Sequence, residues 1–225
     1  MAPVGHYLPQ HLSFCECGGR MVLLDIAHDR YFHLSAPLET AMRALGAGRP
    51  APSGAIDRLL KRGLIVTDAA GGRSVAPAEA TAPSHSAVET AATAPAIAWR
   101  AAPEVAWRLA QARYELRTRS LGAILDRVAR KKSILQRGRP PADRGALTRL
   151  ASRFHGAQRV TPVTPVCLPD SLALLSFLFS RGATADLVIA VSGPPFQAHC
   201  WVQAQDLLLN SPLDLALSFT PIRIL

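Results

Sequence analysis

The chain has 225 residues, a formal net charge of +9, and 49% hydrophobic residues. This length is enough for one large domain or two small ones, and the hydrophobic content can supply a core. The longest apolar stretch, within residues 171–179, is too short to cross a bilayer, and the N-terminus lacks a basic region followed by an apolar run. We therefore expect no membrane partner and a cytoplasmic protein whose four cysteines stay reduced.

Residues 1–68 are expected to form a small N-terminal domain. Three strands are predicted, at residues 11–15, 20–26 and 31–34. Ser35 is a suitable N-cap for a helix through residue 44, and a second helix is predicted over 55–62. Residues 63–67 then return as a strand. This order of strands, helices and a closing strand is typical of a winged-helix-like domain.

The same domain holds two closely spaced cysteines, Cys15 and Cys17. Residues two apart on a strand face the same side and are poorly placed to bridge each other. With His6 and His11 they could form half of a zinc site, but no second pair of cysteine or histidine residues completes it. We therefore expect no metal and no other cofactor.

Residues 69–98 are rich in alanine, with twelve Ala, one Arg and no Lys. A segment of this composition cannot bury enough apolar surface to order itself. We interpret it as a flexible linker between the N-terminal domain and a C-terminal domain over 99–225.

Residues 99–137 have the periodicity of two amphipathic helices and carry most of the positive charge. Each helix has an apolar stripe, formed by Val105, Leu109, Ala112 and Leu116 and then by Leu121, Ile124, Leu125 and Val128. From Trp99 to Arg159 the charge balance is +11, and the rest of the chain carries −2. An acidic partner or nucleic acid would explain the excess. Solvated helix faces explain it more simply, because no nucleic-acid motif and no interleaved aromatic residues accompany it, so we expect no nucleic-acid partner.

The rest of the C-terminal domain is predicted to contain helices followed by strands. A short helix is expected over 146–155, and another over 168–180 has Pro169 and Asp170 in its first turn. Three strands follow, at residues 185–191, 198–203 and 207–210. The whole chain is therefore expected to have an α+β fold.

Cys167 and His199 have the features of a catalytic pair. Cys167 lies at or just before the start of its helix, where the helix dipole favours a thiolate. His199 lies on the second strand, and an imidazole that takes the thiol proton makes a cysteine a useful nucleophile. A helix that carries Cys, packed on an antiparallel sheet that carries His, is the arrangement of papain and transglutaminases. The neighbouring Cys200 should point to the opposite face of its strand and serve only in packing.

The C-terminal domain resembles the B protein of lasso-peptide biosynthesis over about residues 99–215. Three runs carry the resemblance, Cys167 to Leu174, Leu187 to Val191 and Pro195 to Val202. The resemblance implies a transglutaminase-like cysteine peptidase, a hydrolase that removes the leader from a ribosomally made precursor peptide. The released core would then go to a partner, an ATP-using macrolactam synthetase.

The N-terminal domain resembles the leader-recognition domain of the same pathways. Leu23-Leu24-Asp25 followed by Tyr31-Phe32-His33-Leu34-Ser35 carries this resemblance. It implies a winged helix-turn-helix that binds the leader as an added strand, against Tyr31, Phe32, His33 and Leu34. An edge strand with open N–H and C=O groups is suited to that task. Alternatively, Tyr31 and Phe32 simply pack the core of the domain.

The sequence departs from the family just after the histidine strand. The family usually has an Asp there, in a pattern like Asn-Asp, whereas this chain has Asn210-Ser211. Asn can orient a catalytic histidine because its carbonyl accepts the ring N–H. We therefore predict Cys167, His199 and Asn210 as the catalytic residues, with Asp206 and Asp214 as alternatives for the third.

The resulting hypothesis is peptide hydrolysis through an acyl-enzyme on Cys167, with the backbone N–H of that residue as one oxyanion donor. Two alternatives stay open. The first is a leader-binding carrier without catalysis. The second is a transglutaminase-type acyl transfer, in which an amine replaces water as the acceptor.

Overall fold

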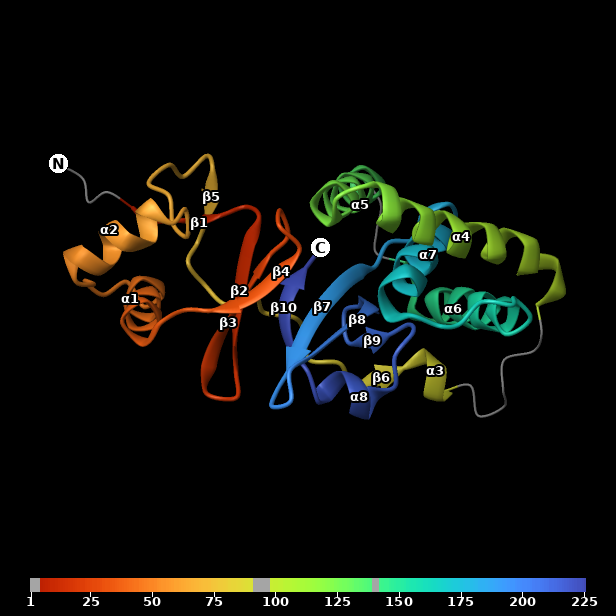
Figure 1. The fold of residues 1–225 in the computed structure, drawn as a ribbon. Helices are drawn as coiled ribbons and strands as arrows, with labels where there is room; N and C mark the ends of the chain where they lie inside the picture. Colours follow the sequence, from red (N-terminus) through yellow and green to blue (C-terminus); the bar gives the residue numbers. More distant parts are fainter. Residues whose placement is uncertain (1–4, 91–97, 139–141) are drawn as a thin grey trace. The chain divides into compact units, whose positions relative to one another are not determined.

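The computed structural model describes residues 5–90, 98–138 and 142–225 (Figure 1). The chain divides into two compact units, Met1–Glu79 and Ala80–Leu225. Each unit combines helices with β-sheet, so the prediction of a mixed helix and sheet fold is confirmed.

The first unit contains a three-stranded antiparallel sheet followed by two helices. The sheet has the order β2-β3-β4, with β2 at Leu12–Cys17, β3 at Arg20–Asp25 and β4 at Arg30–His33. Gly18 and Gly19 join β2 to β3 at φ values of 58° and 75°, which glycine adopts without steric cost. The helices are α1 (Ala36–Gly46) and α2 (Ser53–Lys61), close to their predicted ranges.

The core of this unit forms around β3, the central strand, whose last five residues are all buried. Apolar side chains from the strands, both helices and the segment after α2 fill it: Leu12, Phe14, Met21, Leu23, Leu38, Met42, Leu59 and Ile65. One carboxylate, Glu39 of α1, is buried with them. It accepts the Met21 N–H at 2.9 Å and an N–H of Arg43 at 2.6 Å, which compensates its loss of water.

Residues 63–67 do not form the predicted closing strand. Leu64 and Ile65 are both buried, and two consecutive buried residues lack the alternation of a half-buried strand. Val66 makes a single β-bridge to Tyr7. The strands that pair here are instead β1 (Leu8–Pro9) and β5 (Gly72–Arg73).

The expected linker, residues 69–98, is ordered over much of its described length, which corrects the expectation from composition. Val75 packs in the core of the first unit, and the Ala78 N–H donates to the Phe14 carbonyl at 3.0 Å. In the second unit the segment forms β6 (His85–Ser86) and α3 (Ala87–Thr90). Alanine orders at low cost because its side chain loses no rotamer entropy. Residues 91–97 lie outside the described residues.

The second unit contains a five-stranded sheet with the order β10-β7-β8-β9-β6. The pair β9-β6 is parallel, and the other pairs are antiparallel. The remaining strands are β7 (Asp186–Ser192), β8 (Gln197–Ala204), β9 (Leu207–Leu208) and β10 (Thr220–Ile224). The predictions for β7 and β8 are confirmed, whereas β9 ends before the predicted residue 210 and β10 was not predicted.

Helix α7 lies at the centre of the second unit, between other helices and the sheet (Figure 1). The helices of this unit are η1 (Trp99–Ala101), α4 (Ala102–Thr118), α5 (Leu121–Gln136), α6 (Arg144–Gln158), α7 (Cys167–Phe179) and α8 (Leu213–Leu217). Helix α7 contacts α4, α5, α6, β7 and β8, and most of its residues are buried. A helix that is apolar on nearly every side packs in this way. None of the described helices combines the length and apolar run that crossing a bilayer requires.

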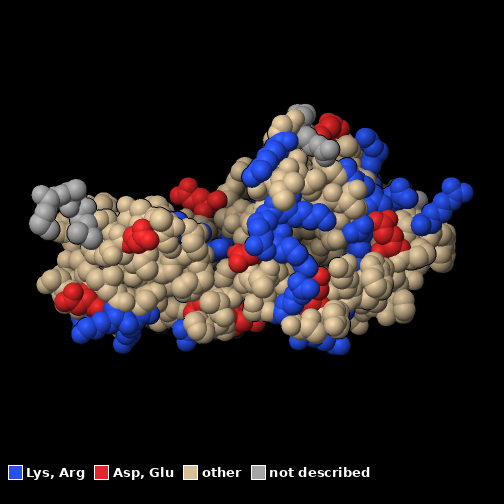
Figure 2. Space-filling view, turned by 90° about the horizontal axis from the view of Figure 1, so that it is seen from above, with Lys and Arg blue, Asp and Glu red and all other residues tan. Residues whose placement is uncertain are grey.

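The positive charge of the chain is concentrated on this second unit. Figure 2 shows Lys and Arg side chains gathered most densely over the half of the view that holds its helices. The same helices carry the +11 balance between Trp99 and Arg159.

Candidate active site

The first turn of α7 places Cys167 at the first helical position, as predicted. Val166 precedes it as N-cap in an extended conformation, at φ −139° and ψ 129°. The Asp170 carboxylate accepts the Val166 N–H at 3.1 Å and the Gln158 side-chain amide at 2.8 Å. Burial raises the pKa of Asp170, although the Val166 N–H and the Arg113 guanidinium act in the opposite direction. These bonds fix the path of the chain into the helix and therefore position the thiol.

Strand β8 supplies the imidazole. His199 lies opposite Ala190 of β7 in the sheet register. The centroid of its ring is 5.3 Å from that of Phe219 and 5.9 Å from that of Trp201. These ring contacts hold a half-buried imidazole in place.

The surroundings of Cys167 favour its thiolate. Hydrogen bonds from the Cys200 thiol and then from the His199 ring lower the pKa of Cys167 from 9.0 to about 4, although burial acts in the opposite direction. The pKa of Cys200 is raised well above 9.0, because its thiol donates to Cys167 and is itself buried. The two sulfurs therefore divide their roles, with the negative charge on Cys167 and the proton on Cys200.

An open cavity of about 300 Å³ adjoins both Cys167 and His199. Its other lining residues come from α3, α6, the start of α7 and the sheet: Val88, Phe154, His155, Gln158, Pro165, Val166, Asp170, Cys200 and Asn210. One of these, His155, is hydrogen-bonded within the domain, because its Nε2 lies 2.8 Å from the Leu209 carbonyl oxygen. A largely apolar hollow with a few convergent polar groups is the usual form of a substrate site.

The structure brings Ser211 to the imidazole and does not bring Asn210 there. Ser211 Oγ lies 3.4 Å from His199 Nε2. Asn210 Oδ1 accepts the Val202 N–H at 2.7 Å, and its Nδ2 donates to Ser171 Oγ at 2.9 Å. The carbonyl that was expected to accept the imidazole N–H is therefore bonded to the backbone of β8.

The two carboxylates considered as alternatives lie elsewhere. Asp206 accepts the Ser84 hydroxyl at 2.5 Å, contacts His85 Nδ1 at 3.1 Å and pairs with Arg144. These contacts, the Ser84 bond first, lower the pKa of Asp206 to about 2. Asp214 is exposed on α8. We therefore assign neither of them to the site.

The predicted leader-binding residues lie on or next to β4, which is an edge strand of the sheet in the first unit. Tyr31 and Phe32 are half-buried and His33 is exposed, whereas Leu34 is buried in the core. Phe32 packs against that core, and the guanidinium of Arg30 lies 5.3 Å from its ring centroid. The strand thus has one side attached to β3 and side chains that are only partly used in packing.

A comparison with protein families identifies the second unit. The model of the transglutaminase-like superfamily matches residues 108–224, just over half of the chain, and this range includes Cys167 and His199. The chain belongs to the transglutaminase-like superfamily. The fold of this superfamily typically carries cysteine-dependent enzymes, with peptidase or acyltransferase chemistry. Neither the comparison with curated proteins nor that with solved structures gave a match.

The transglutaminase-like site differs from a metal centre in its ligand set. Over residues 5–90, 98–138 and 142–225, no three His, Cys, Asp or Glu side chains are grouped so that they could hold a metal ion. The groups that the site does offer are a thiol, an imidazole and backbone N–H donors, which suit acyl transfer.

Two functional contacts of this site escaped the sequence prediction. Cys200 was expected only to pack, yet its thiol bonds to Cys167 and lies 3.8 Å from Ser171 Oγ. Ser211 was not predicted, because the analogy with papain-like enzymes favoured the carbonyl of Asn210. The position of Ser211 could have indicated this contact, since Ser211 stands where the family's Asn-Asp pattern has the aspartate.

Proposed function

We propose that the chain is a cysteine peptidase that cleaves the leader from a ribosomally made lasso-peptide precursor. The observation that carries the proposal is the Cys167 thiol, whose pKa is lowered to about 4 beside His199 and an open cavity. A thiol with this pKa is ionised at neutral pH and is a ready nucleophile. Membership of the transglutaminase-like superfamily supports peptidase or acyl-transfer chemistry. The leader and the lasso pathway come from the sequence resemblance.

In the proposed reaction the Cys167 thiolate attacks the carbonyl carbon of the last leader residue. His199, carrying the proton taken from the thiol, gives it to the leaving amine as the peptide bond breaks. The core peptide leaves with a free N-terminus, and the leader remains as a thioester on sulfur. A water molecule, deprotonated by His199, then attacks the thioester, which releases the leader carboxylate and restores the thiolate.

Ser211 is the residue that we propose to position the imidazole. Its Oγ lies 3.4 Å from His199 Nε2. Asn210 does not contact the imidazole in this proposal. Its side chain instead hydrogen-bonds to Val202 of β8 and to Ser171 of α7. It thereby holds the helix that carries the nucleophile against the strand that carries the base.

The start of α7 supplies the proposed oxyanion donor. Among the described residues, no acceptor bonds the backbone N–H of Cys167, which belongs to the first helical turn. This N–H and the positive end of the helix dipole stabilise negative charge that develops on the carbonyl oxygen.

The first unit is proposed as the leader-recognition domain, with the winged helix-turn-helix character that the resemblance implies. Its β4 is an edge strand, and an extended peptide can add to such an edge through backbone hydrogen bonds. The partly exposed Tyr31, Phe32 and His33 would give this pairing sequence preference. Binding the leader there raises the effective concentration of the scissile bond at a catalytic unit on the same chain.

The test is an incubation of the full chain with its precursor peptide, alone and with the macrolactam synthetase plus ATP, read by mass spectrometry. We expect the free leader and a core with a free N-terminus, both absent with Cys167→Ala. The matched control is Cys17→Ala, which removes a thiol from the first unit and should cleave normally.

Two other products would overturn the peptidase assignment. An amine adduct of the leader would indicate a transglutaminase-type acyl transfer through the same thioester. An intact precursor under every condition, despite measurable leader binding, would indicate a carrier without catalysis.

A further inference from the structure

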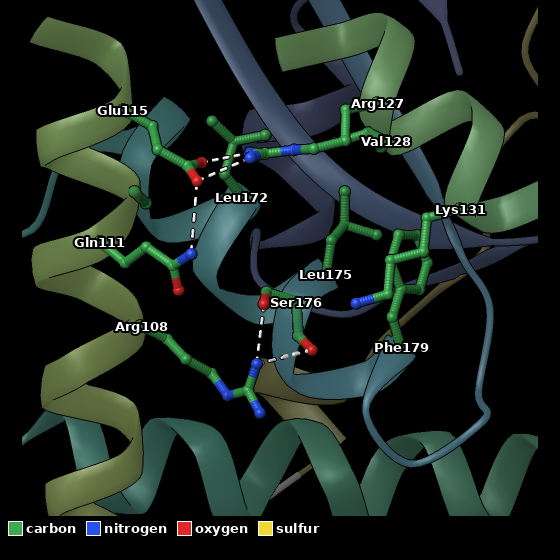
Figure 3. Close-up of a pocket in the computed structure, with 11 residues that line it drawn as sticks. Arg108, Gln111, Glu115, Arg127, Val128, Lys131, Leu172, Leu175, Ser176 and Phe179 are labelled. Atoms are coloured by element: carbon green, nitrogen blue, oxygen red, sulfur yellow. Dashed lines mark hydrogen bonds and ion pairs between the residues drawn. The ribbon is translucent and has the colours of Figure 1, made fainter. Parts of the chain in front are cut away.

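A second cavity lies on the other side of α7, away from the proposed reaction. It has a volume of about 180 Å³ and lies between α4, α5 and α7 (Figure 3). Its floor is apolar, formed by Leu172, Leu175 and Phe179 of α7, whereas α4 and α5 contribute polar walls. The cavity is smaller than the roughly 300–1,000 Å³ of small-molecule sites, so it fits one or two side chains of a larger partner.

Most charged groups in the walls are already paired. The Glu115 carboxylate of α4 binds the Arg127 guanidinium of α5 through both of its oxygens and also accepts from Gln111 at 3.3 Å. Arg108 donates to Glu104 at 2.7 Å and to both oxygens of Ser176, at 2.9 and 2.7 Å. These contacts give the cavity fixed walls.

Lys131 is the cation that remains unpaired. Across the part of the chain that the structure describes, no carboxylate lies within ion-pair distance of its ammonium group, which is 5.9 Å from the Phe179 ring centroid. Figure 3 shows the Lys131 ammonium and the Arg108 guanidinium directed toward Ser176 from opposite walls. The Glu104 carboxylate pairs with both Arg108 and Arg181. Its single negative charge therefore neutralises only one of these two arginines. The cavity therefore has an excess of positive charge beside an apolar floor.

Exposed aromatic residues lie on the same helix as one wall. Trp107 and Tyr114 of α4 are 70% and 67% exposed, and they are four residues before and three residues after Gln111 of the wall. At this spacing the three residues share one face of the helix. On α5, Ile134 is 64% exposed and lies three residues after Lys131. The sequence prediction that no aromatic residues interleave with the charge is therefore wrong for this face.

We propose that this face of α4 and α5 is a docking site for a partner protein that presents an acidic segment containing an apolar residue. A carboxylate would pair with Lys131, and the neighbouring apolar side chain would contact Leu172 and Phe179, the floor residues with the most exposed surface. Tryptophan, tyrosine and arginine are the residue types that dominate binding energy at protein interfaces. An unpaired cation at the mouth would steer an acidic partner toward it.

Nucleic acid fits this cavity less well than an acidic peptide does. A carboxylate, Glu115, lines the wall, and the guanidinium of Arg127 is already engaged with it. The floor is apolar, and apolar surface attracts a leucine or phenylalanine side chain more than a phosphate. The proposal does not depend on the peptidase chemistry, since none of its residues takes part in the reaction.

The test uses full-length protein with Cys167→Ala, so that no probe can be cleaved. The probes are fluorescein-labelled decapeptides with four Glu or Asp residues around one Leu, Phe or Trp, followed by fluorescence anisotropy. We expect acidic peptides to bind, and the same peptides with Gln and Asn at the acidic positions to bind at least about tenfold more weakly. Raising the salt concentration should weaken binding of the acidic peptides.

Two charge reversals separate local docking from a general effect of net charge. Lys131→Glu should weaken peptide binding by about tenfold or more, whereas Lys61→Glu, an equal charge change on exposed α2, should change it by less than about twofold. Lys131→Arg should retain binding, and Trp107→Ala should weaken it severalfold. Thermal melting of each variant shows that a loss of binding is not a loss of fold.

Three results would overturn the proposal. The first is that no acidic peptide of the panel binds the protein. The second is an equal loss of affinity with Lys131→Glu and Lys61→Glu. The third is that a labelled ten-nucleotide single strand binds more tightly than every peptide and is weakened by Lys131→Glu, which would assign the face to nucleic acid.

Discussion

The two ends of α7 carry opposite charges. The first residue, Cys167, has its thiolate favoured by hydrogen bonds from Cys200 and His199. Near the other end, Arg108 donates to the Ser176 carbonyl at 2.9 Å and Arg181 donates to the Phe177 carbonyl at 3.0 Å. Anions at the N-terminus and cations at the C-terminus are the arrangement that the helix dipole favours.

The two ends differ in whether their charged groups are held in ion pairs or adjoin an open cavity. The cations at the C-terminal end share the Glu104 carboxylate, whose pKa is lowered to about 2 by Arg181 first and then by Arg108. The thiolate at the N-terminal end adjoins an open cavity. One end of the helix is therefore fixed by ion pairs and the other is open to a substrate, so changes at the two ends should affect different properties.

The largest effect is expected from His199→Ala at the N-terminal end. Loss of the base removes both the acceptor of the thiol proton and the donor to the leaving amine, which should lower kcat by roughly 10²–10⁴-fold. Initial rates of precursor cleavage measure it. A matched change on the same sheet, Gln197→Ala at the exposed start of β8, should leave the rate nearly unchanged. Equal losses in both variants would argue against a specific role for the imidazole.

The next effect separates Ser211 from Asn210. Ser211→Ala should lower kcat by several-fold without loss of stability, and Ser211→Asp should raise kcat, because a carboxylate accepts the imidazole N–H more strongly. Asn210→Ala should instead lower the free energy of unfolding by about 1–3 kcal/mol, since it leaves the Val202 N–H and the Ser171 hydroxyl without their partner. Kinetics and urea unfolding of the three variants test this. A kcat loss with unchanged stability in Asn210→Ala would restore Asn210 as the residue that orients the ring.

The third effect concerns the pH at which Cys167 ionises. Its lowered pKa means that the thiolate persists as the pH falls and is lost only as the pH passes through about 4. The rate of alkylation of Cys167 by iodoacetamide, followed by peptide mapping, should show this midpoint. Cys200→Ala should move the midpoint upward, because it removes the largest stabilising contact of the thiolate. A midpoint near 9.0 in the unmodified chain would show that the thiolate is not favoured.

The smallest effect is expected at the C-terminal end. Arg181→Ala removes an ion pair with Glu104 and a guanidinium that lies 3.5 Å from the Phe177 ring centroid, and we expect about 1–2 kcal/mol of lost stability. Thermal unfolding measures it. The alkylation midpoint of Cys167 should stay unchanged, and a shift in that midpoint would show that the two ends are coupled.

The elements that sequence patterns predicted well are those with strong local signals. Cys167 was placed correctly at the start of its helix because Pro169 and Asp170 mark a first turn and an apolar run follows. Strand β8 was placed from its apolar, β-branched and aromatic residues. The α8 helix and the β10 strand were missed, because five residues each give little periodicity and Pro221 interrupts the second.

The parts that could not be predicted depend on contacts between distant residues. Strand β6 lies in an alanine-rich segment, and its order comes from pairing with β9 about 120 residues later. The prediction of Asn210 did not foresee the contact between Ser211 and the imidazole for a similar reason. These residues follow the end of β9, where the alternation of a strand no longer says which side chain faces the imidazole.

The pairing of β6 with β9 also determines how the second unit can be shortened. The family match begins at residue 108, yet a fragment cut there would lack β6 and expose β9 as a bare sheet edge prone to aggregation. It would also lose Ser86, whose hydroxyl donates to the Ser211 carbonyl at 2.8 Å, and Glu89, which accepts the Leu213 N–H at 2.9 Å. A truncation that keeps the sheet of the second unit intact should therefore start near Ala80, where that unit begins.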